Sequence, residues 1–378
     1  MGLTLAVTTE QTAGETRVAA TPDTVKKWTT AGLTVNIQSG AGLGASVPDD
    51  AFTAAGATIV KTAKEALKAA DIVLKVRGPA KDEIAALKDG AIVIATLDPY
   101  REKDTLNALA AKGASAYAME FVPRITRAQV MDVLSSQANL AGYRAVIEAA
   151  SAYGKAFPMM MTAAGTVAPA KAFIMGVGVA GLQAIATARR LGAVVTATDV
   201  RPATKEQVES LGAKFLAVED EEFKNAQTAG GYAKEMSAEY KAKQAALTAS
   251  HIAKQDIVIT TALIPGRQAP ILVTKEMVAS MKPGSVLIDL AAPQGGNVEG
   301  CVADKVVDVG GVKIIGFSNI VAAIAADASA LYAKNLQAFV GLLIDKDGNL
   351  APDAEDEILK AALVTAGGAV VHPNLKGA

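Results

Sequence analysis

Three glycines near the middle of the chain follow a short apolar run with the spacing G-x-G-x-x-G. Gly176, Gly178 and Gly181 come directly after residues 172–175. In a loop of this kind the first glycine allows a tight turn. The second lets a pyrophosphate approach the backbone, and the third lets the next helix pack closely on the strand. Asp199 lies 23 residues after Gly176 and can accept hydrogen bonds from both hydroxyls of a ribose. The pattern predicts dinucleotide binding.

The segments around these glycines match the elements that such a site requires. Residues 172–175 and 193–198 are short and apolar, as buried strands are. Residues 180–191 contain no proline, are rich in helix formers and stop at Gly192, so they predict a helix. The helix N-terminus, at Val179 and Ala180, would present N–H groups and partial positive charge to the phosphates. A purely structural βαβ unit is the alternative interpretation.

The residue types at the end of the second strand bear on which dinucleotide binds. The carboxylate of Asp199 would repel a 2′-phosphate, which favours NAD(H) over NADP(H). Arg201, two residues later, argues the other way. We expect Arg201 to pack on adenine or to lie in solvent.

Composition and length limit the class of protein. The 378 residues are 51% hydrophobic but only 4% aromatic, as expected for aliphatic parallel sheets in two domains. Lys plus Arg (37) nearly balances Asp plus Glu (38) without a basic block, so nucleic acid is not an expected partner. One cysteine and two distant histidines predict neither a disulfide nor a metal site. No segment predicts a signal peptide or a membrane span, so we expect a cytoplasmic protein without direct membrane insertion.

Apolar runs alternate with helical segments through the first 121 residues, which implies parallel strands with right-handed crossovers. The expected strands are residues 3–7, 34–38, 57–60, 71–76, 91–97 and 115–121, and the expected helices are residues 22–31, 63–70, 81–88 and 103–112. A long helical segment, 132–157, follows as a connector. Where the chain enters this segment, Gln129 and Asp132 would lie on one face of the helix if the helix begins early. Local pattern alone favours a helix cap and its solvated first turn.

After the glycine loop the alternation continues with one interruption. Residues 204–207 form a capping box that predicts a helix ending at Gly212, before a strand at 213–218. Residues 219–236 break the pattern and predict a mobile flap. The pattern then resumes, with a helix at 237–254, strands at 256–261, 285–290 and 312–315, and a second long helix at 323–340. We assign that helix and the C-terminal tail to the first domain.

Several long strings resemble a known family. The run Arg124-Ile-Thr-Arg-Ala-Gln-Val-Met-Asp-Val-Leu-Ser-Ser-Gln and the run Thr228-Ala-Gly-Gly-Tyr-Ala-Lys-Glu-Met are similar to the NAD(H)-binding component of proton-translocating nicotinamide nucleotide transhydrogenase. The string Thr260-Thr-Ala-Leu-Ile-Pro-Gly resembles it too, and the resemblance covers nearly the whole chain. The sequence departs from the family pattern at residues 8–10, 293–294 and 319–324.

The resemblance implies an α/β homodimer with two Rossmann-like domains. Their parallel sheets would be joined by the two long helices, 132–157 and 323–340, with NAD(H) in the cleft between the domains. The first domain would comprise residues 1–131 plus 325–378. The NAD(H)-binding domain would comprise residues 132–324.

The resemblance also implies the roles of individual residues. Arg124, Gln129 and Asp132 would hold the nicotinamide and its ribose at the reacting end, with Ser135 as a further ligand. Gly231 and Tyr232 match a mobile loop that closes over the nucleotide. The remaining nucleotide contacts implied are Asp199, Val200, Arg201, Gln244 and Leu263.

The family performs direct hydride transfer between NAD(H) bound on this component and NADP(H) bound on a partner subunit. A transmembrane subunit couples this transfer to proton translocation, which implies a peripheral position on the cytoplasmic face of the inner membrane.

Alanine dehydrogenase shares the fold and is the rival interpretation, because Arg17 and Lys75 match its keto-acid positions. That chemistry needs a proton donor near neutral pH, normally a histidine in the first domain. No histidine precedes His251. A non-enzymatic NAD(H) sensor is the third interpretation.

Overall fold

The computed structural model describes residues 2–226, 236–264 and 266–375. The chain divides into two compact units. Unit 1 consists of residues 1–137 and 321–378, and unit 2 of residues 138–320. Each unit is built on a mostly parallel sheet with helices on its faces, which confirms the predicted α/β class.

The sheet of unit 1 has the strand order β17-β16-β6-β5-β4-β1-β2-β3. The strands are β1 Thr4–Val7, β2 Thr34–Gln38, β3 Thr58–Val60, β4 Ile72–Arg77, β5 Ile92–Thr96, β6 Ser115–Ala118, β16 Leu363–Ala366 and β17 Ala369–Val370. Strands β1 to β6 pair in parallel, whereas β16 is antiparallel to β6 and β17 to β16. The expectation of a wholly parallel sheet is therefore wrong at this edge, where the C-terminal tail adds a hairpin.

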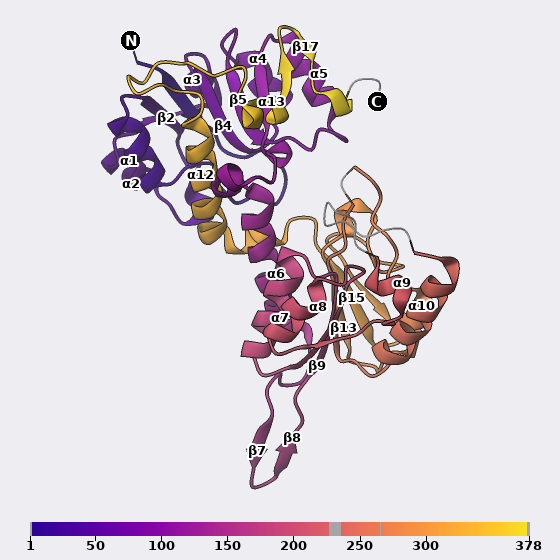
Figure 1. The fold of residues 1–378 in the computed structure, drawn as a ribbon. Coiled ribbons are helices and arrows are strands. Elements are labelled where there is room, and N and C mark those ends of the chain that lie inside the picture. The colour runs from indigo at the N-terminus through magenta and orange to yellow at the C-terminus, as the bar shows by residue number, and fades with distance from the viewer. Residues whose placement is uncertain (1, 227–235, 265, 376–378) are drawn as a thin grey trace. The chain divides into compact units, whose positions relative to one another are not determined.

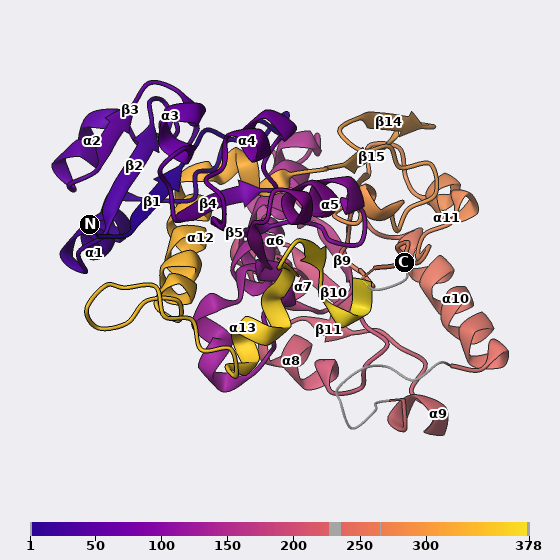
Figure 2. The same ribbon diagram turned by 90° about the horizontal axis from the view of Figure 1, so that it is seen from above.

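Alternate residues of these strands face two different helix layers, as the two-residue period of a strand requires. Leu5 packs in one core with Trp28 and Tyr332, whereas Ala6 packs in the other with Leu67. The first layer holds α1 Pro22–Thr30, α2 Asp49–Ala54, α12 Ala325–Val340 and α13 Glu357–Ala362. The second holds α3 Ala63–Leu67, α4 Lys81–Ala86 and α5 Lys103–Ala111. Figures 1 and 2 both show α12 lying against this sheet.

The sheet of unit 2 has the order β11-β10-β9-β12-β13-β15-β14. Its strands are β9 Lys171–Met175, β10 Val194–Thr198, β11 Lys214–Phe215, β12 Ile257–Thr260, β13 Val286–Asp289, β14 Val306–Val309 and β15 Val312–Gly316. All pair in parallel except the edge strand β14, which is antiparallel to β15. Figure 1 shows α7 on one side of this sheet and α10 on the other. Helix α6, Val133–Ala152, begins in unit 1 and continues into unit 2 from Ala138. The other helices of unit 2 are α7 Val179–Arg190, α8 Thr204–Ser210, α9 Glu221–Lys224, α10 Ala238–Ile252 and α11 Lys275–Ser280.

Short 3-10 helices occupy six connections in the described part of the chain. They span Leu43–Ala45, Met119–Phe121, Thr126–Met131, Ala292–Gln294, Ile320–Ile324 and Pro373–Leu375. The segment Met119–Phe121 was expected to continue strand β6, but the backbone turns at Ala118 and leads toward η3, residues Thr126–Met131.

The connector helix α6 is shorter than predicted. It ends at Ala152 rather than near residue 157. A hairpin that the sequence pattern did not predict follows, with strands β7 Met160–Thr162 and β8 Gly165–Val167. All six of these strand residues are exposed, and Met161 is 78% exposed. Figure 1 shows the hairpin extending away from the rest of unit 2.

In unit 2 the structure differs from two local predictions, the start of helix α8 and the start of the flap. Helix α8 has Ala203 as its N-cap and no capping box, because the hydroxyl of Thr204 donates to the carbonyl of Arg201 instead. The start of the predicted flap contains α9, whose Phe223 is buried in a small cluster that includes Met236 and Tyr240. Residues 227–235, the centre of the predicted flap, lie outside the described residues.

Helix α6 approaches the start of α7 at a glycine. A Cβ atom built on Gly142 would lie 2.0 Å from the carbonyl oxygen of Ala180 and 3.0 Å from its Cα. Both neighbours are backbone atoms in the first turn of α7, so neither can rotate away. The glycine therefore sets the spacing between the two helices.

We predict that Gly142→Ala destabilises unit 2 despite the better helix propensity of alanine. Propensity would stabilise the helix by about 1 kcal/mol. Forcing a methyl group into packed backbone typically costs about 1–3 kcal/mol or more, so the net effect should be a loss. The matched control is Gly154→Ala, because a Cβ at Gly154 meets no atom within 4 Å. Denaturant unfolding of both variants tests this, and equal stability of the two would contradict it.

Candidate functional site

The glycine loop between β9 and α7 has the conformation that its spacing predicts. Gly176 adopts φ +98°, a left-handed conformation that side chains disfavour, and its carbonyl accepts a hydrogen bond from the hydroxyl of Thr261 at 3.0 Å. A Cβ on Gly181 would lie 1.9 Å from the carbonyl oxygen of Gly176. The first and third glycines are thus required by backbone packing alone, whether or not a ligand binds.

The second glycine differs from the other two. A Cβ on Gly178 would meet no atom within 4 Å, so packing within the protein does not require glycine there. Gly178 is the exposed N-cap of α7, and no side chain of the described residues caps this helix. Val179 is exposed and Ala180 half-buried beside it. Free N–H groups, the positive end of the helix dipole and open space fit a pyrophosphate group.

Asp199 ends strand β10 beside this loop. Its Oδ2 accepts the backbone N–H of Val177 at 2.7 Å and a guanidinium N–H of Arg201 at 2.9 Å. Its Oδ1 accepts the backbone N–H and Nε–H of Arg201, each at 2.9 Å. A carboxylate has about four acceptor positions, and all are in use. Arg201 is therefore ion-paired with Asp199 rather than free in solvent, whereas its packing on adenine stays a prediction. The side-chain hydrogen bonds to Asp199 raise the pKa of Arg201.

The other predicted contacts of unit 2 lie along the same edge of the sheet. Val200 and Leu263 are exposed after β10 and β12, with 54% and 48% of their surface accessible. Gln244 is engaged in packing, since its Oε1 accepts the N–H of Val218 at 2.9 Å and its amide reaches Thr198 at 3.4 Å. Gly231 and Tyr232 lie outside the described residues.

One residue that sequence reasoning missed shapes this edge. Asn297 is fully buried, accepts the N–H of Ala262 at 3.0 Å, and donates to the carbonyls of Ala262 and Pro270. It therefore fixes the loop that presents Leu263. No sequence spacing indicates this role, because Asn297 lies 35 residues away from that loop.

Unit 1 holds the second group of predicted residues, on and around η3. Arg124 and Gln129 are exposed, and neither side chain makes a hydrogen bond or ion pair with the described part of the chain. Asp132 accepts the N–H of Ser135 at 2.8 Å and its hydroxyl at 2.5 Å, at the start of α6. This is the helix cap that the local pattern favours. The side chains of Arg124 and Gln129 are thus available to contact a ligand. Asp132 and Ser135 are hydrogen-bonded to each other.

Comparison with known proteins identifies the chain. Family models described as alanine dehydrogenase/PNT match it, the N-terminal domain over residues 6–141 and the C-terminal domain over residues 145–373. A Rhodospirillum rubrum protein named as the first portion of NAD(P) transhydrogenase subunit alpha is 55% identical over 379 residues, which cover 99% of each chain. The chain belongs to the NAD(P) transhydrogenase subunit alpha family.

Solved structures agree with this assignment. The crystal structure of transhydrogenase from Sinorhizobium meliloti is 56% identical and matches with a TM-score of 0.90, covering 97% of this chain and 100% of that one. An L-alanine dehydrogenase is 26% identical with a TM-score of 0.84, covering 99% of this chain and 98% of that one. The transhydrogenase family and alanine dehydrogenase therefore share one architecture, and side-chain chemistry must separate them.

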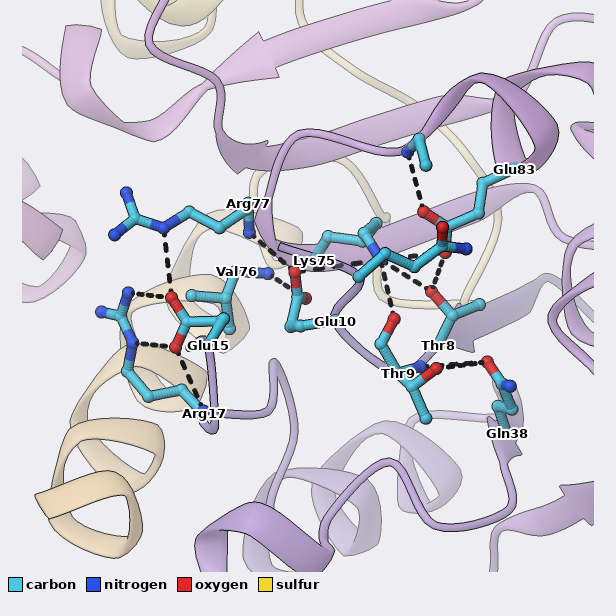
Figure 3. A network of polar contacts seen from close by, with 12 residues as sticks. Thr8, Thr9, Glu10, Glu15, Arg17, Gln38, Lys75, Val76, Arg77 and Glu83 are labelled. Atoms are coloured by element: carbon cyan, nitrogen blue, oxygen red, sulfur yellow. Dashed lines mark hydrogen bonds and ion pairs between the residues drawn. The ribbon is translucent and has the colours of Figure 1, made fainter. Parts of the chain in front are cut away.

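In this transhydrogenase family member, a buried polar cluster fills the carboxyl ends of β1 and β4, where the strand order reverses (Figure 3). The ammonium group of Lys75, 1% exposed, donates to the hydroxyl of Thr8 and to a carboxyl oxygen of Glu83, each at 2.9 Å. Glu10 accepts the N–H groups of Val76 and Arg77 at 2.7 and 3.1 Å. Burial raises the pKa of Glu10, against the opposing charge of Lys75.

Arg17 is paired in the same cluster. Its guanidinium binds both carboxyl oxygens of Glu15, at 2.8 and 2.6 Å, and Arg77 adds a contact to Glu15 at 3.1 Å (Figure 3). Burial alone would raise the pKa of Glu15, but the hydrogen bonds and charge of Arg17 lower it to about 2. Arg17 and Lys75, the residues expected to bind a keto-acid under the alanine dehydrogenase interpretation, are therefore both engaged by glutamates of this chain.

Glu120, in the turn that leads to Arg124, fixes the end of β5. Its carboxyl oxygens accept the N–H groups of Leu97 and Asp98 at 3.1 and 2.5 Å, and Asp98 has a left-handed φ of +45°. Burial raises the pKa of Glu120 to about 7, although these hydrogen bonds oppose the shift.

We predict that unit 1 loses stability as pH rises from about 4.5 to about 7. Because the folded-state pKa of Glu120 lies above its ordinary value of 4.5, the folded protein holds a proton that the unfolded chain releases across this window. Glu120→Gln should remove that part of the pH dependence. Thermal unfolding of the native chain and the variant between pH 4.5 and 8 measures it. Parallel profiles would contradict the assignment to Glu120.

Among the described residues, no group of three or more His, Cys, Asp or Glu side chains is arranged to hold a metal ion. Within the same described ranges, no helix has the length and apolar composition to cross a membrane. The two histidines pack against aromatic rings. His251 contacts Phe173 and pairs with the hydroxyl of Thr196 at 2.8 Å, and His372 lies on Phe121. Burial lowers the pKa of both.

Proposed function

We propose that this chain binds NAD(H) and exchanges hydride directly with NADP(H) held by a partner subunit. The observation that most strongly supports this proposal is the match to a transhydrogenase alpha-subunit protein over 99% of both lengths. The chain also has the G-x-G-x-x-G loop at the uncapped N-terminus of α7. In this proposal the glycine loop and Asp199 hold the adenosine and pyrophosphate of the cofactor. Arg124 and Gln129 position the nicotinamide, with the Asp132–Ser135 pair beside them.

The nicotinamide rings supply the hydride chemistry, so the chain must supply position. Hydride transfer between two rings moves no proton to or from a side chain. Such a site needs orientation and electrostatics rather than an acid or base. The exposed side chains of Arg124 and Gln129, which have no partner among the described residues, suit that task because each can bind a ligand without first breaking a contact.

Side-chain chemistry argues against an alanine-dehydrogenase-like reaction. Reduction of a keto-acid or imine requires a proton donor near neutral pH. Both histidines pack against aromatic rings, His251 on Phe173 and His372 on Phe121, and burial lowers the pKa of each, which disfavours the protonated form that would donate. Glu120 titrates near neutrality, but its two oxygens accept backbone N–H groups. Arg17 and Lys75 are engaged by glutamates.

The family relationship supports further subunits. The Rhodospirillum rubrum relative is named as one portion of an alpha subunit, so we infer that NADP(H) binding and membrane passage belong to partner subunits. We propose that those subunits couple hydride transfer to proton translocation, and that this chain lies at the cytoplasmic face of the inner membrane. The exposed apolar hairpin β7–β8 supports a homodimer, because Met160 and Met161 expose 43% and 78% of their surface.

We predict that Asp199→Ala weakens NADH binding by about 1–3 kcal/mol, the scale of a lost charged hydrogen bond. The matched control is Arg201→Ala. Because Arg201 now occupies acceptor positions on Asp199, this variant should bind NADH at least as tightly as the native chain. Calorimetry with NADH and NADPH measures both. Equal affinity of the native chain for the two nucleotides would contradict the role of Asp199.

The decisive experiment mixes the purified chain with the NADP(H)-binding component of a transhydrogenase. Reduction of the thionicotinamide analogue of NADP⁺ by NADH, followed by absorbance, should require both proteins. In the Gln129→Asn variant the amide is one methylene shorter. NADH affinity should persist while transfer falls by about tenfold or more, since small displacements strongly slow such reactions. No transfer by the native mixture would overturn the proposed function.

A further inference from the structure

The exposed segment η3, residues Thr126–Met131, carries Gln129 on its outer side. Its backbone is held from the inner side by a buried amide of helix α12. Asn335, only 7% exposed, donates from Nδ2 to the carbonyl oxygen of Val130 at 2.7 Å. Val130 is the residue directly after Gln129, and its own side chain is 63% exposed. The hydrogen bond thus fixes the peptide next to Gln129 without contacting its side chain.

The same amide also holds the start of α6. The Oδ1 atom of Asn335 accepts the hydroxyl of Ser136 at 2.8 Å. Ser136 directly follows Ser135, which is bonded to Asp132. One side chain therefore ties together the two ends of a short stretch, from Gln129 to Ser136, that carries three of the proposed nicotinamide contacts.

Asparagine suits this position because it combines one donor and one acceptor on a rigid plane. The carbonyl of Val130 can only accept, so the donor end of the amide must face it, and this settles the orientation of the side chain. Aspartate would place negative charge against that carbonyl. Leucine has a similar size but neither group. A buried amide with both ends paired is costly to replace, because each abandoned partner stays unsatisfied.

We propose that Asn335 is a positioning residue for hydride transfer, acting through the backbone of η3 on Gln129. The inference rests on the proposed function. Asn335 contacts neither nucleotide nor reacting atoms, and its effect is to hold the peptide of Val130 and the cap of α6 in fixed register. Loss of either anchor lets the Gln129 amide move relative to the ring that it orients. Nucleotide affinity depends mainly on the glycine loop and should change little.

The test compares four proteins in the mixture with the NADP(H)-binding component: the native chain, Asn335→Leu, Asn335→Asp and the control Ser329→Ala. Ser329 lies on the same helix and is also buried, but its hydroxyl accepts the N–H of Val18 rather than supporting η3. NADH dissociation constants come from calorimetry, and single-turnover transfer to thionicotinamide-NADP⁺ is measured at saturating NADH.

We expect both Asn335 variants to bind NADH within about threefold of the native chain, while transfer falls by about tenfold or more, as for small misplacements of reacting groups. Ser329→Ala should lose stability but transfer hydride at the native rate. If all three variants transfer alike, or if affinity falls in proportion to rate, the inference is overturned. Absence of transfer in the native mixture would instead overturn the proposed function.

A second variant covers the case in which the buried substitutions do not fold. Ser136→Ala, at a half-buried position, removes only the second anchor of Asn335. Its transfer rate should lie between those of the native chain and the Asn335 variants, at unchanged NADH affinity. A native transfer rate in Ser136→Ala, with NADH binding intact, would count against the inference by itself.

Discussion

Backbone contact around the first turn of α7 is the constraint on which unit 2 depends. Three backbone segments, from α6, the end of β9 and the start of α7, meet there without side chains between them. The positions of Gly142 and Gly181 leave only 2.0 and 1.9 Å where a Cβ would have to fit. The helix N-terminus is thereby fixed beside the carboxyl end of the sheet. This placement suits the phosphate site that we propose, because the unpaired N–H groups of the first turn need a fixed direction to bind an anion.

Unit 1 uses the equivalent sheet edge differently. Where its strand order reverses, at β1 and β4, the space is occupied by charged side chains of the chain itself rather than by a glycine loop. Buried charges are tolerated only when paired and hydrogen-bonded, and Lys75 and Arg17 each have a carboxylate within 3 Å. At this edge of unit 1 the charged side chains therefore bind one another and stabilise the fold. The exposed side chains that we propose to position the nicotinamide lie instead on and beside η3, after β6.

The two groups of proposed site residues answer different physical demands. In the proposed site the glycine loop would meet the cofactor through main-chain groups. Asp199 would meet it through a carboxylate whose acceptor positions Arg201 must first release. Arg124 and Gln129 would meet it through exposed side chains, and Asn335 holds the backbone directly after Gln129. A reaction in which two cofactors do the chemistry requires mainly that geometry be kept. Rigid backbone beneath adaptable side chains is a suitable way to keep it.

Much of unit 2 and the alternation of unit 1 was predictable because both rest on local rules. The glycine spacing, the helix stop at Gly192 and the strand ending at Asp199 each follow from backbone freedom and hydrophobic period, and the structure confirms them. The resemblance of the strings around Gln129 predicted the family, which the comparisons confirm. Gly142 could have been noticed too, since a glycine inside a helix is unfavourable unless packing requires it.

Only the tertiary structure decided which side chains pair. Arg201 closes on Asp199, Asn297 holds a loop 35 residues away, and Asn335 reaches a carbonyl 205 residues earlier in the chain. The exposed hairpin β7–β8 and the antiparallel edge strands β14, β16 and β17 were likewise hidden from local pattern. Sequence determines period, turns and capping because these act within a few residues. Long-range hydrogen bonds depend on where folded elements come together, and no spacing along the chain records that.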